Sequence, residues 1–267
     1  IALIINFFFP LDKTTNNLVL LTAIFLFFFF KKDYFNQKYL IFSLVVSILT
    51  FLLITKSHTY RPDAGLYHLP YIGILNSEKI IFGLTNLHFR FGHTSIIQYT
   101  STIFNNSLFK SNGIIFPTAL IFSAVIINFF TQIFNNLKKK KYNLHLFFLI
   151  FSLIFILIKM SRYSEFGNDT PSHLLFLFLI SEILRNDFIH NNEEIKNFFI
   201  ISIFIFLNKV FLIISIFFPF IFINKKKIKK IFVSKKAIFG TLFLFLWIMK
   251  NIIVSGCALY PMKQTCI

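Results

Sequence analysis

Long apolar stretches alternate with short polar segments along the chain, and this alternation predicts a bundle of helices. Phe, Ile and Leu fill the apolar stretches, while Lys, Asn and Asp gather between them. A helix needs about 20 apolar residues to cross a hydrocarbon core of about 30 Å, and fewer when the crossing is partial. The stretches that meet this description cover residues 1–9, 17–30, 39–55, 113–134, 143–158, 171–184, 197–207, 210–223 and 237–250. We therefore expect an all-α fold, a polytopic transmembrane helical bundle.

The longest polar segment covers residues 56–112 and carries a helical pattern of its own. Apolar residues recur at helical spacing from about 64 to 77, which predicts a short helix at the membrane interface. A second helix is expected from about 92 to 110. Between the two, the sequence GLTNLHFRFGH at 83–93 has a glycine near each end, which indicates a structured turn. A long loop of this kind is more typical of a functional segment than of a linker.

Composition agrees with a membrane protein and predicts its orientation. The 267 residues are 56% hydrophobic and include 42 Phe, a profile that soluble domains rarely have. The formal net charge of +17 comes from lysine clusters between the apolar stretches, where the positive-inside rule places cytoplasmic loops. The charge is therefore a topology signal, and no nucleic-acid partner is expected. The cytoplasmic clusters lie at residues 31–38, 138–141, 185–196 and 225–236.

With these clusters in the cytoplasm, the other connections face the exterior, at residues 10–16, 56–112, 159–170, 208–209 and 251–267. This path requires Asn208 and Lys209 to form a turn between two short helices, because a single crossing would put the lysines that follow on the exterior. The whole chain, residues 1–267, is expected to form one transmembrane domain. It begins inside an apolar run and stops just after a loop has begun, so we expect a fragment of a longer protein.

Polar side chains gather at the head of the long exterior loop, where Arg61, Asp63, Tyr67 and His68 fall within eight residues. Asp63 and Tyr67 are four residues apart and so share a helical face. A carboxylate in a wet cleft at the membrane surface stays ionised, and there it can accept a proton from a sugar hydroxyl or coordinate a cation. The alternative is structural, because an aspartate that follows Pro62 and precedes an apolar helix is also a good N-cap.

Histidines and an arginine follow in the same loop. His68, His88 and His93 lack the two-histidine spacing of a zinc helix, so hydrogen-bonding roles are favoured and the spacing does not support a divalent metal cofactor. His88 and Arg90 alternate with two phenylalanines, which would point both polar side chains to one side of an extended segment. Arg90 can bind phosphate bidentately, or its side chain can snorkel to lipid head groups.

Charged residues also mark two later exterior segments. Asp169, close to Arg162 in sequence, is either a helix cap or a second wall of the site that contains Asp63. Lys209 is costly at membrane depth unless it reaches water or an anion, and at an exterior turn it is placed to bind a lipid phosphate.

The last exterior segment contains both cysteines. Cys257 and Cys266 lie nine positions apart, and Ser255, Gly256 and Pro261 around them indicate a turn. An oxidising compartment makes a disulfide between the two feasible, and a pair of free thiols is the alternative.

The segments that hold these residues resemble known membrane proteins. An Asp in the first large exterior loop, a second acidic loop and short crossings joined by basic loops resemble the GT-C class of integral-membrane glycosyltransferases. More narrowly, DAGLYHLPYIGIL, IIFGLTNLHFRFGHTS, NDTPSHLL and SGCALYP are similar to segments of an uncharacterised bacterial family of multi-pass membrane proteins. Those segments have the form D.GLYH..I, GL.NLH.R.G..S, DLP..LL and SG..LYP. The resemblance covers residues 61–261, and GLYH and NLH.RFG are its most specific parts.

The resemblance implies an enzyme of the bacterial inner (plasma) membrane that moves a sugar from a polyprenyl-phosphate donor to a glycan, lipid or protein acceptor on the non-cytoplasmic face. It implies Asp63 as the catalytic residue, although Ala64 stands where the best-known members have a second acid. The substrate-binding residues expected around it are Arg61, Tyr67, His68, His88, Arg90, Arg162, Asp169 and Lys209. The alternatives are a polysaccharide polymerase or ligase, a transporter of lipid-linked glycans, and a structural membrane subunit.

Overall fold

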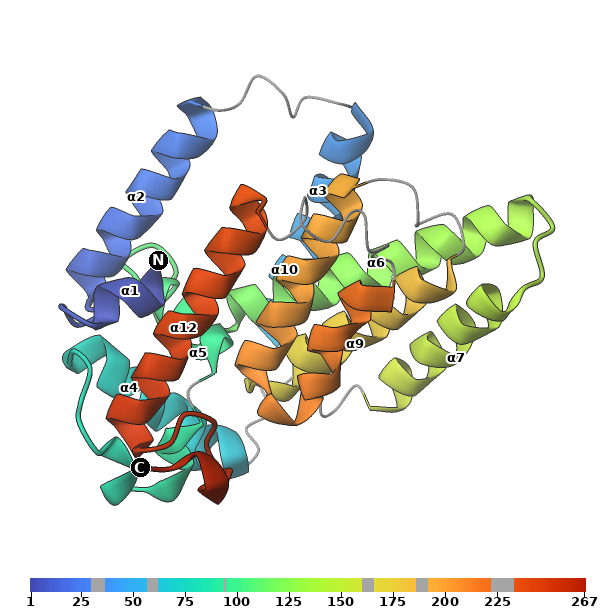
Figure 1. Cartoon of the computed structure of the whole chain (residues 1–267). Helices are drawn as coiled ribbons and strands as arrows, with labels where there is room; N and C mark the ends of the chain where they lie inside the picture. Colours follow the sequence, from blue (N-terminus) through green and yellow to red (C-terminus); the bar gives the residue numbers. More distant parts are fainter. Residues whose placement is uncertain (30–36, 57–61, 94, 160–165, 186–191, 222–232) are drawn as a thin grey trace.

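The computed structural model describes residues 1–29, 37–56, 62–93, 95–159, 166–185, 192–221 and 233–267. This part of the chain is helical and contains no strand, apart from an isolated antiparallel bridge between Cys257 and Cys266. The predicted all-α class is therefore confirmed for the described residues (Figure 1).

The longer helices follow the predicted apolar stretches. They are α2 (Lys13–Phe29), α3 (Gln37–Lys56), α6 (Phe116–Lys138), α7 (Leu144–Ile158), α9 (Asp169–Leu184), α10 (Asn192–Asn208), the kinked helix η7 (Val210–Ile221) and α12 (Lys235–Ser255). The predicted break at Asn208 and Lys209 is confirmed, because α10 ends at Asn208 and η7 begins at Val210.

The shorter helices belong mainly to the N-terminus, the long loop and the C-terminus. They are α1 (Ala2–Asn6), η2 (Ala64–His68), α4 (Leu69–Ser77), η3 (Leu84–Asn86), η4 (Phe89–Gly92), α5 (Ile96–Ile103), η5 (Lys110–Ile115) and η8 (Lys263–Thr265). The helix predicted at about 64–77 is present as η2 and α4, and η2 is a π-helix, a form that is frequent at functional sites.

The helix expected at about 92–110 is much shorter than predicted. Its start is defined by Ser95 and Gln98, which form a capping box at the N-terminus of α5. After Ile103, the Asn106 side chain accepts hydrogen bonds from the backbone N–H groups of Leu108 and Phe109, at 3.0 Å each. A local side-chain acceptor of this kind competes with the helical pattern, so α5 does not continue.

Two helical stretches among the described residues are long and apolar enough to cross a membrane, Lys110–Lys138 and Lys235–Ser255. More than half of the most apolar part of each lies at the surface of the structure. Shorter apolar helices cover Lys13–Phe29, Ile41–Leu53, Leu144–Ile158 and Val210–Ile221. Many large apolar side chains on them are exposed, and a surface of this kind is unfavourable in water. The number of crossings stays a prediction.

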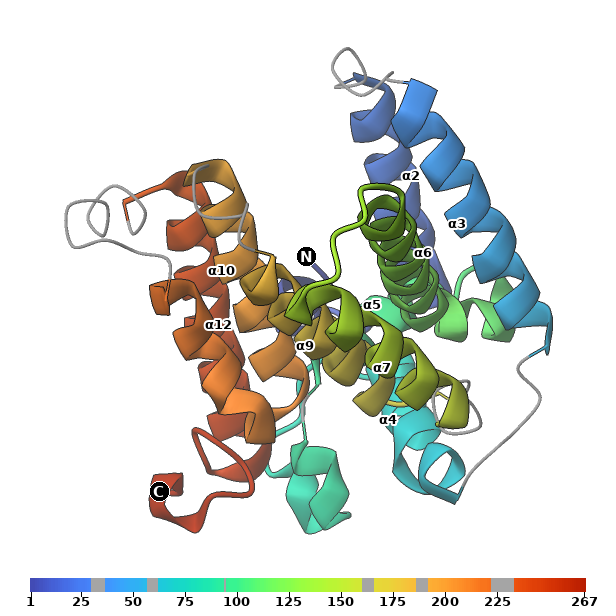
Figure 2. The ribbon, with the colours of Figure 1, turned by 90° about the vertical axis from the view of Figure 1, so that its right-hand side faces the viewer.

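Helix α10 lies at the centre of the packing, between α9 and α12, and also contacts η7 (Figures 1 and 2). One buried apolar cluster joins α10 and α12 to the N-terminal segment, α4 and α5, and a second joins α6, α7 and α9. Polar contacts tie the same elements together. The buried Lys250 amine donates a 2.7 Å hydrogen bond to Asn6 Oδ1 and lies 3.9 Å from the centre of the Tyr99 ring.

The directions of α9, α10 and α12 determine which of their ends lie together. Helices α10 and α12 begin close together, where Lys236 Nζ lies 3.2 Å from Glu193 Oε2 and 2.7 Å from Asn197 Oδ1. Both helices run in the same direction and end near the C-terminal segment (Figure 1). Helix α9 runs the opposite way, from Asp169 to a C-cap at Arg185. The Arg185 end of α9 and the lysine-bearing start of α12 therefore lie away from the end that contains Asp169 and Asn208.

Candidate functional site

A cavity of about 150 Å³ lies where α10 and α12 end and α9 begins. Side chains from the long loop and the C-terminal segment complete its wall. Its polar lining consists of Tyr67, Arg90, His93, Ser95, Asn168, Asp169, Asn208, Lys209, Asn251 and Tyr260. Four of the predicted substrate-binding residues, Tyr67, Arg90, Asp169 and Lys209, therefore share one cavity.

Asp63 lies beside this cavity and is joined to it through Arg90. The Arg90 Nη1 atom is 3.4 Å from Asp63 Oδ1, and the guanidinium carbon lies 4.7 Å from the centre of the Tyr67 ring. Asp63 precedes η2 with a helical backbone, and its side chain makes no capping hydrogen bond. The position is that of a cap, as the structural alternative predicted, but the carboxylate binds Arg90 instead.

The phenol of Tyr67 is influenced by two carboxylates and one guanidinium. Burial raises the pKa of the Tyr67 phenol, and the negative charges of Asp63 and Asp169 raise it further, while Arg90 acts in the opposite direction. Both charges thus act on one phenol, although Asp63 belongs to the long loop and Asp169 to the first turn of α9. The phenol stays protonated at neutral pH and is available as a hydrogen-bond donor.

Lys209 binds an acid of the protein itself. Its Nζ atom lies 2.5 Å from Asp169 Oδ1 and 3.3 Å from His173 Nε2. The sequence predicted a lysine that reaches water or an anion, and the anion present is Asp169. Asp169 lies in the first turn of α9, whose N-cap position is occupied by Asn168. The carboxylate therefore faces Lys209 at the helix N-terminus, where negative charge is also favoured by the helix dipole.

The two predicted histidines take supporting positions. His68 is buried behind Tyr67, with ring centres 4.2 Å apart, and its Nδ1 atom is 3.0 Å from Gln98 Nε2. Burial lowers the pKa of His68 to about 4, so the ring is neutral at pH 7. His88 Nδ1 accepts a hydrogen bond of 3.3 Å from the backbone N–H of Arg90. His88 thus fixes the turn that presents Arg90, and neither histidine lines the cavity.

Sequence reasoning left several residues of the cavity wall out of the predicted site, above all His93, for which it favoured a hydrogen-bonding role, and Asn208, which it placed in the turn with Lys209. Burial lowers the pKa of His93, and the positive charges of Arg90 and Lys209 lower it further. Asn208 Oδ1 accepts hydrogen bonds from Ser95 Oγ at 3.0 Å and from a backbone N–H of α5 at 2.6 Å. The polar break that identified Lys209 contains Asn208 too, so the same signal could have identified both.

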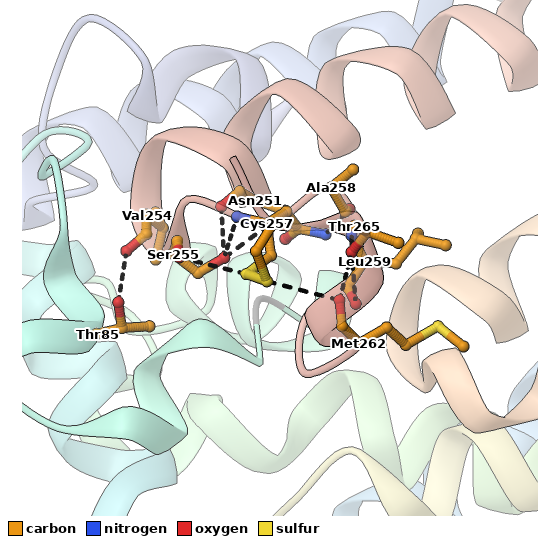
Figure 3. Close-up of a disulfide and its surroundings, with 10 residues drawn as sticks. Thr85, Asn251, Val254, Ser255, Cys257, Ala258, Leu259, Met262 and Thr265 are labelled. Carbon is orange, nitrogen blue, oxygen red and sulfur yellow. Dashed lines mark hydrogen bonds between the residues drawn. A yellow bond between two sulfur atoms is a disulfide. The ribbon is translucent and has the colours of Figure 1, made fainter.

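The C-terminal segment, at the bottom of Figure 1, contributes Tyr260 and Pro261 to the cavity wall. Of the two alternatives that the sequence left open for Cys257 and Cys266, a disulfide and a pair of free thiols, the structure has the disulfide (Figure 3). Tyr260, within this disulfide loop, lies with its ring 5.2 Å from that of His93. A Cβ atom at Gly92 would meet Tyr260 at 2.8 Å, so only glycine permits the long loop to approach so closely.

Arg61 and Arg162, the two remaining predicted binding residues, lie outside the described residues. Within the part of the chain that the structure describes, no three His, Cys, Asp or Glu side chains come together in a way that would hold a metal ion.

The chain matches a protein family over residues 1–267, described as "Domain of unknown function (DUF8201)". The chain belongs to the DUF8201 family. No curated protein and no solved structure matches it. Because the description of DUF8201 states no activity, the chemistry of this DUF8201 member has to be inferred from its cavity.

Proposed function

We propose that this protein is a membrane glycosyltransferase of the GT-C type, which moves a sugar from a polyprenyl-phosphate donor to a glycan, lipid or protein acceptor on the non-cytoplasmic face. One observation carries the proposal. Two carboxylate–cation pairs, Asp63 with Arg90 and Asp169 with Lys209, lie at one end of the helical bundle, and both cations line one cavity with Tyr67. A transfer site needs such a combination of a base and of cations for a leaving phosphate.

The membrane setting is supported by the surface of the described helices. Two of them are long and apolar enough to cross a bilayer, and others are apolar but shorter. The basic ends of α6, α9 and α12 lie away from the cavity, which agrees with a cytoplasmic basic side and an exterior cavity. On this basis we propose a multi-pass protein of the bacterial inner membrane, with the cavity at its outer surface.

In the proposed reaction Asp63 is the general base. Its side chain is 61% exposed, so an acceptor hydroxyl can reach it from the water side of the membrane. The carboxylate takes the hydroxyl proton as the acceptor oxygen attacks the anomeric carbon, and the bond from that carbon to the lipid phosphate oxygen breaks. Tyr67 donates a hydrogen bond from its protonated phenol to the reacting sugar, while buried His68 holds the position of this segment.

The two cations supply the electrostatic part of the proposed mechanism. Charge builds up on the lipid phosphate as it leaves, and fixed positive groups stabilise that charge without reorganising. Arg90 offers a planar guanidinium for two phosphate oxygens, and Lys209 offers a compact ammonium group. Each is held by its carboxylate partner before the substrate binds, so the phosphate takes over contacts that are already oriented.

The proposal is tested by substitution of Asp63 in the full chain. In membranes supplied with a labelled polyprenyl-phosphate sugar, Asp63→Asn should slow transfer by about 10²–10⁴-fold, the usual contribution of a general base. Glu78→Gln is the matched control, because it removes one exposed carboxylate from the same loop at a position outside the cavity. Full transfer by Asp63→Asn would contradict the assignment. Sensitivity at Arg90 and His88 with tolerance at Asp63 would favour a polysaccharide ligase instead.

A further inference from the structure

A second polar cavity, of about 320 Å³, lies at the basic end of the bundle. It is formed by the C-terminal part of α6, the turn that follows, the start of α7 and the C-cap of α9. Its volume falls in the range of small-molecule sites, about 300–1,000 Å³. Helix α9 connects it to the first cavity, the one lined by Asp169 and Lys209, which is called the outer cavity below. Asp169 begins that helix and Arg185 caps it. At about 1.5 Å per residue, the two cavities are roughly 24 Å apart.

Positive charge dominates this second cavity. Lys139, Lys141 and Arg185 line it, together with Gln132, Asn136 and His145. Among the described residues, one carboxylate stands behind the lining, that of the buried Glu182, and it is already engaged. Glu182 Oε2 lies 3.1 Å from Arg185, and Glu182 Oε1 accepts a hydrogen bond of 2.9 Å from Gln132 Nε2. Neither Lys139 nor Lys141 forms an ion pair with a carboxylate of the described residues, so the cavity carries an excess of positive charge.

The arrangement is set by the backbone. The turn between α6 and α7 is held by a 2.9 Å hydrogen bond from the backbone N–H of Lys141 to the carbonyl of Asn136. Asn143 Oδ1 accepts a 3.0 Å hydrogen bond from the backbone N–H of Leu146 and so caps α7. The Asn136 amide lies 3.4 Å from His145 Nδ1 across the cavity wall. The two lysines therefore project from a fixed turn, and a ligand would meet a formed site.

A second observation points to a ligand. Gln132 lines the cavity, and its Oε1 atom is buried with no hydrogen-bond partner in the part of the chain described. The amide nitrogen of the same side chain is occupied by Glu182 and by Asn128 Oδ1, the latter at 2.6 Å. A buried acceptor without a donor is unfavourable, and a hydroxyl or a protonated phosphate oxygen would satisfy it.

We propose that this cavity binds the phosphate group of a phosphorylated ligand on the basic side of the protein. Two lysines and one arginine match the charge and the acceptor oxygens of a phosphate, and the glutamine oxygen accepts a hydrogen bond from its protonated oxygen or a neighbouring hydroxyl. The phosphate belongs either to a lipid head group or to a soluble phosphate compound. The inference does not rest on the proposed transfer reaction, because no residue of the outer cavity takes part.

The test uses two double variants of the purified full chain in detergent. Lys139→Gln with Lys141→Gln removes two charges that line the cavity. Lys138→Gln with Lys140→Gln removes two charges from the same turn that do not line it, and is the matched control. Binding of three probes is measured by calorimetry: inorganic pyrophosphate, short-chain phosphatidic acid and short-chain phosphatidylcholine.

The proposal predicts that the parent binds a phosphate probe and that the cavity variant binds it at least about tenfold more weakly, whereas the control changes by about twofold or less. Binding of pyrophosphate would identify a soluble ligand, and binding of phosphatidic acid alone would identify a lipid head group. If both double variants bound the phosphate probe equally weakly, the probe would be held by the general positive charge of the turn and not by the cavity. That result would overturn the proposal. The proposal would also be overturned if the parent bound neither pyrophosphate nor phosphatidic acid.

Glu182→Gln provides a variant with the opposite expected sign. It removes the carboxylate that stands behind the cavity and keeps a side chain of the same shape, so phosphate binding should strengthen by a few fold. Weaker binding in Glu182→Gln, with unchanged thermal stability, would contradict the electrostatic basis of the site.

Discussion

The two ends of α9 hold cavities that differ in how charge is arranged. At the outer end each cation has a carboxylate partner, Arg90 with Asp63 and Lys209 with Asp169. At the basic end two lysines join Arg185 around a cavity with one carboxylate, among the residues described, behind it. A balanced set of charges can exchange protons and partners during a reaction, whereas an excess of positive charge serves to hold an anion. The difference separates a proposed site of chemistry from a proposed site of binding.

Lowering the pH should have the largest effect on stability, and it should act through His68, at the end of α9 that contains the outer cavity. Burial lowers the pKa of His68 to about 4 from an ordinary value of 6.5, so below pH 6.5 the unfolded chain binds a proton that the folded chain does not. The free energy of unfolding should therefore fall as pH falls from 6.5 towards 4, by about 3 kcal/mol in full. The check is to measure the free energy of unfolding of the detergent-solubilised protein at several pH values.

His68→Gln is the matched variant for this prediction, since glutamine can still bind Gln98 but does not titrate. It should lose clearly less stability than the parent over the same pH range. Some pH dependence will remain, because burial lowers the pKa of His93 in the same direction. Identical pH profiles for parent and His68→Gln would show that the sensitivity lies elsewhere.

Removing the disulfide should have the next largest effect on stability, and it should act at the end that contains the outer cavity. Cys257 and Cys266 are separated by nine positions, and closing a loop of that length stabilises a fold by about 2–3 kcal/mol. Replacing both with serine should lower the free energy of unfolding by that amount and slow transfer, because Tyr260 in the loop lines the outer cavity. Reductant should destabilise the parent and leave the double variant unchanged; an equal response would contradict the prediction.

Lysine substitution should distinguish the two ends directly. Lys209→Met removes a charge-assisted contact in which both side chains are less than a third exposed, and should cost about 2 kcal/mol of stability. Lys139→Met removes an exposed charge at the other end, and should change stability by about 0.5 kcal/mol or less. The measurement is the unfolding midpoint of each variant. Similar losses at both positions would remove the distinction between paired and excess charge.

A small change in stability is also expected for Arg90→Gln. The Arg90 and Asp63 side chains are 41% and 61% exposed, and exposed pairs of this kind contribute about 0–1 kcal/mol. Transfer should nevertheless fall about 100-fold, because a cation for the leaving phosphate is lost. A large loss of stability with little loss of transfer would show that the pair is structural.

Much of the fold could be predicted because it follows from local patterns. The apolar stretches predicted the longer helices, and the polar pair Asn208 and Lys209 predicted the break between α10 and η7. The shortened α5 could not be read from periodicity, because Asn106 ends the helix through contacts of its own side chain. The burial of Lys250 could not be predicted either, since its partners Asn6 and Tyr99 come from distant parts of the sequence.

The sequence predicted which charged residues belong to the candidate site, but it did not predict how they pair. Clustering of charges between apolar stretches identified Asp63, Arg90, Asp169 and Lys209. It could not reveal which carboxylate meets which cation, because pairing depends on how distant loops pack. The lysines of the basic end predicted only the orientation in the membrane, since a linear pattern does not show that they line a concave surface.

The central claim is that Asp63 and Asp169 serve one site, and a double-mutant cycle on the transfer rate tests it most directly. Residues that act as a unit are strongly non-additive. We predict that Asp63→Asn and Asp169→Asn each slow transfer at least tenfold, and that the double variant is slower than the worse single variant by no more than about threefold. If the rate reduction in the double variant instead equals the product of the two single reductions, the carboxylates act independently. The claim that they serve one site would then be wrong.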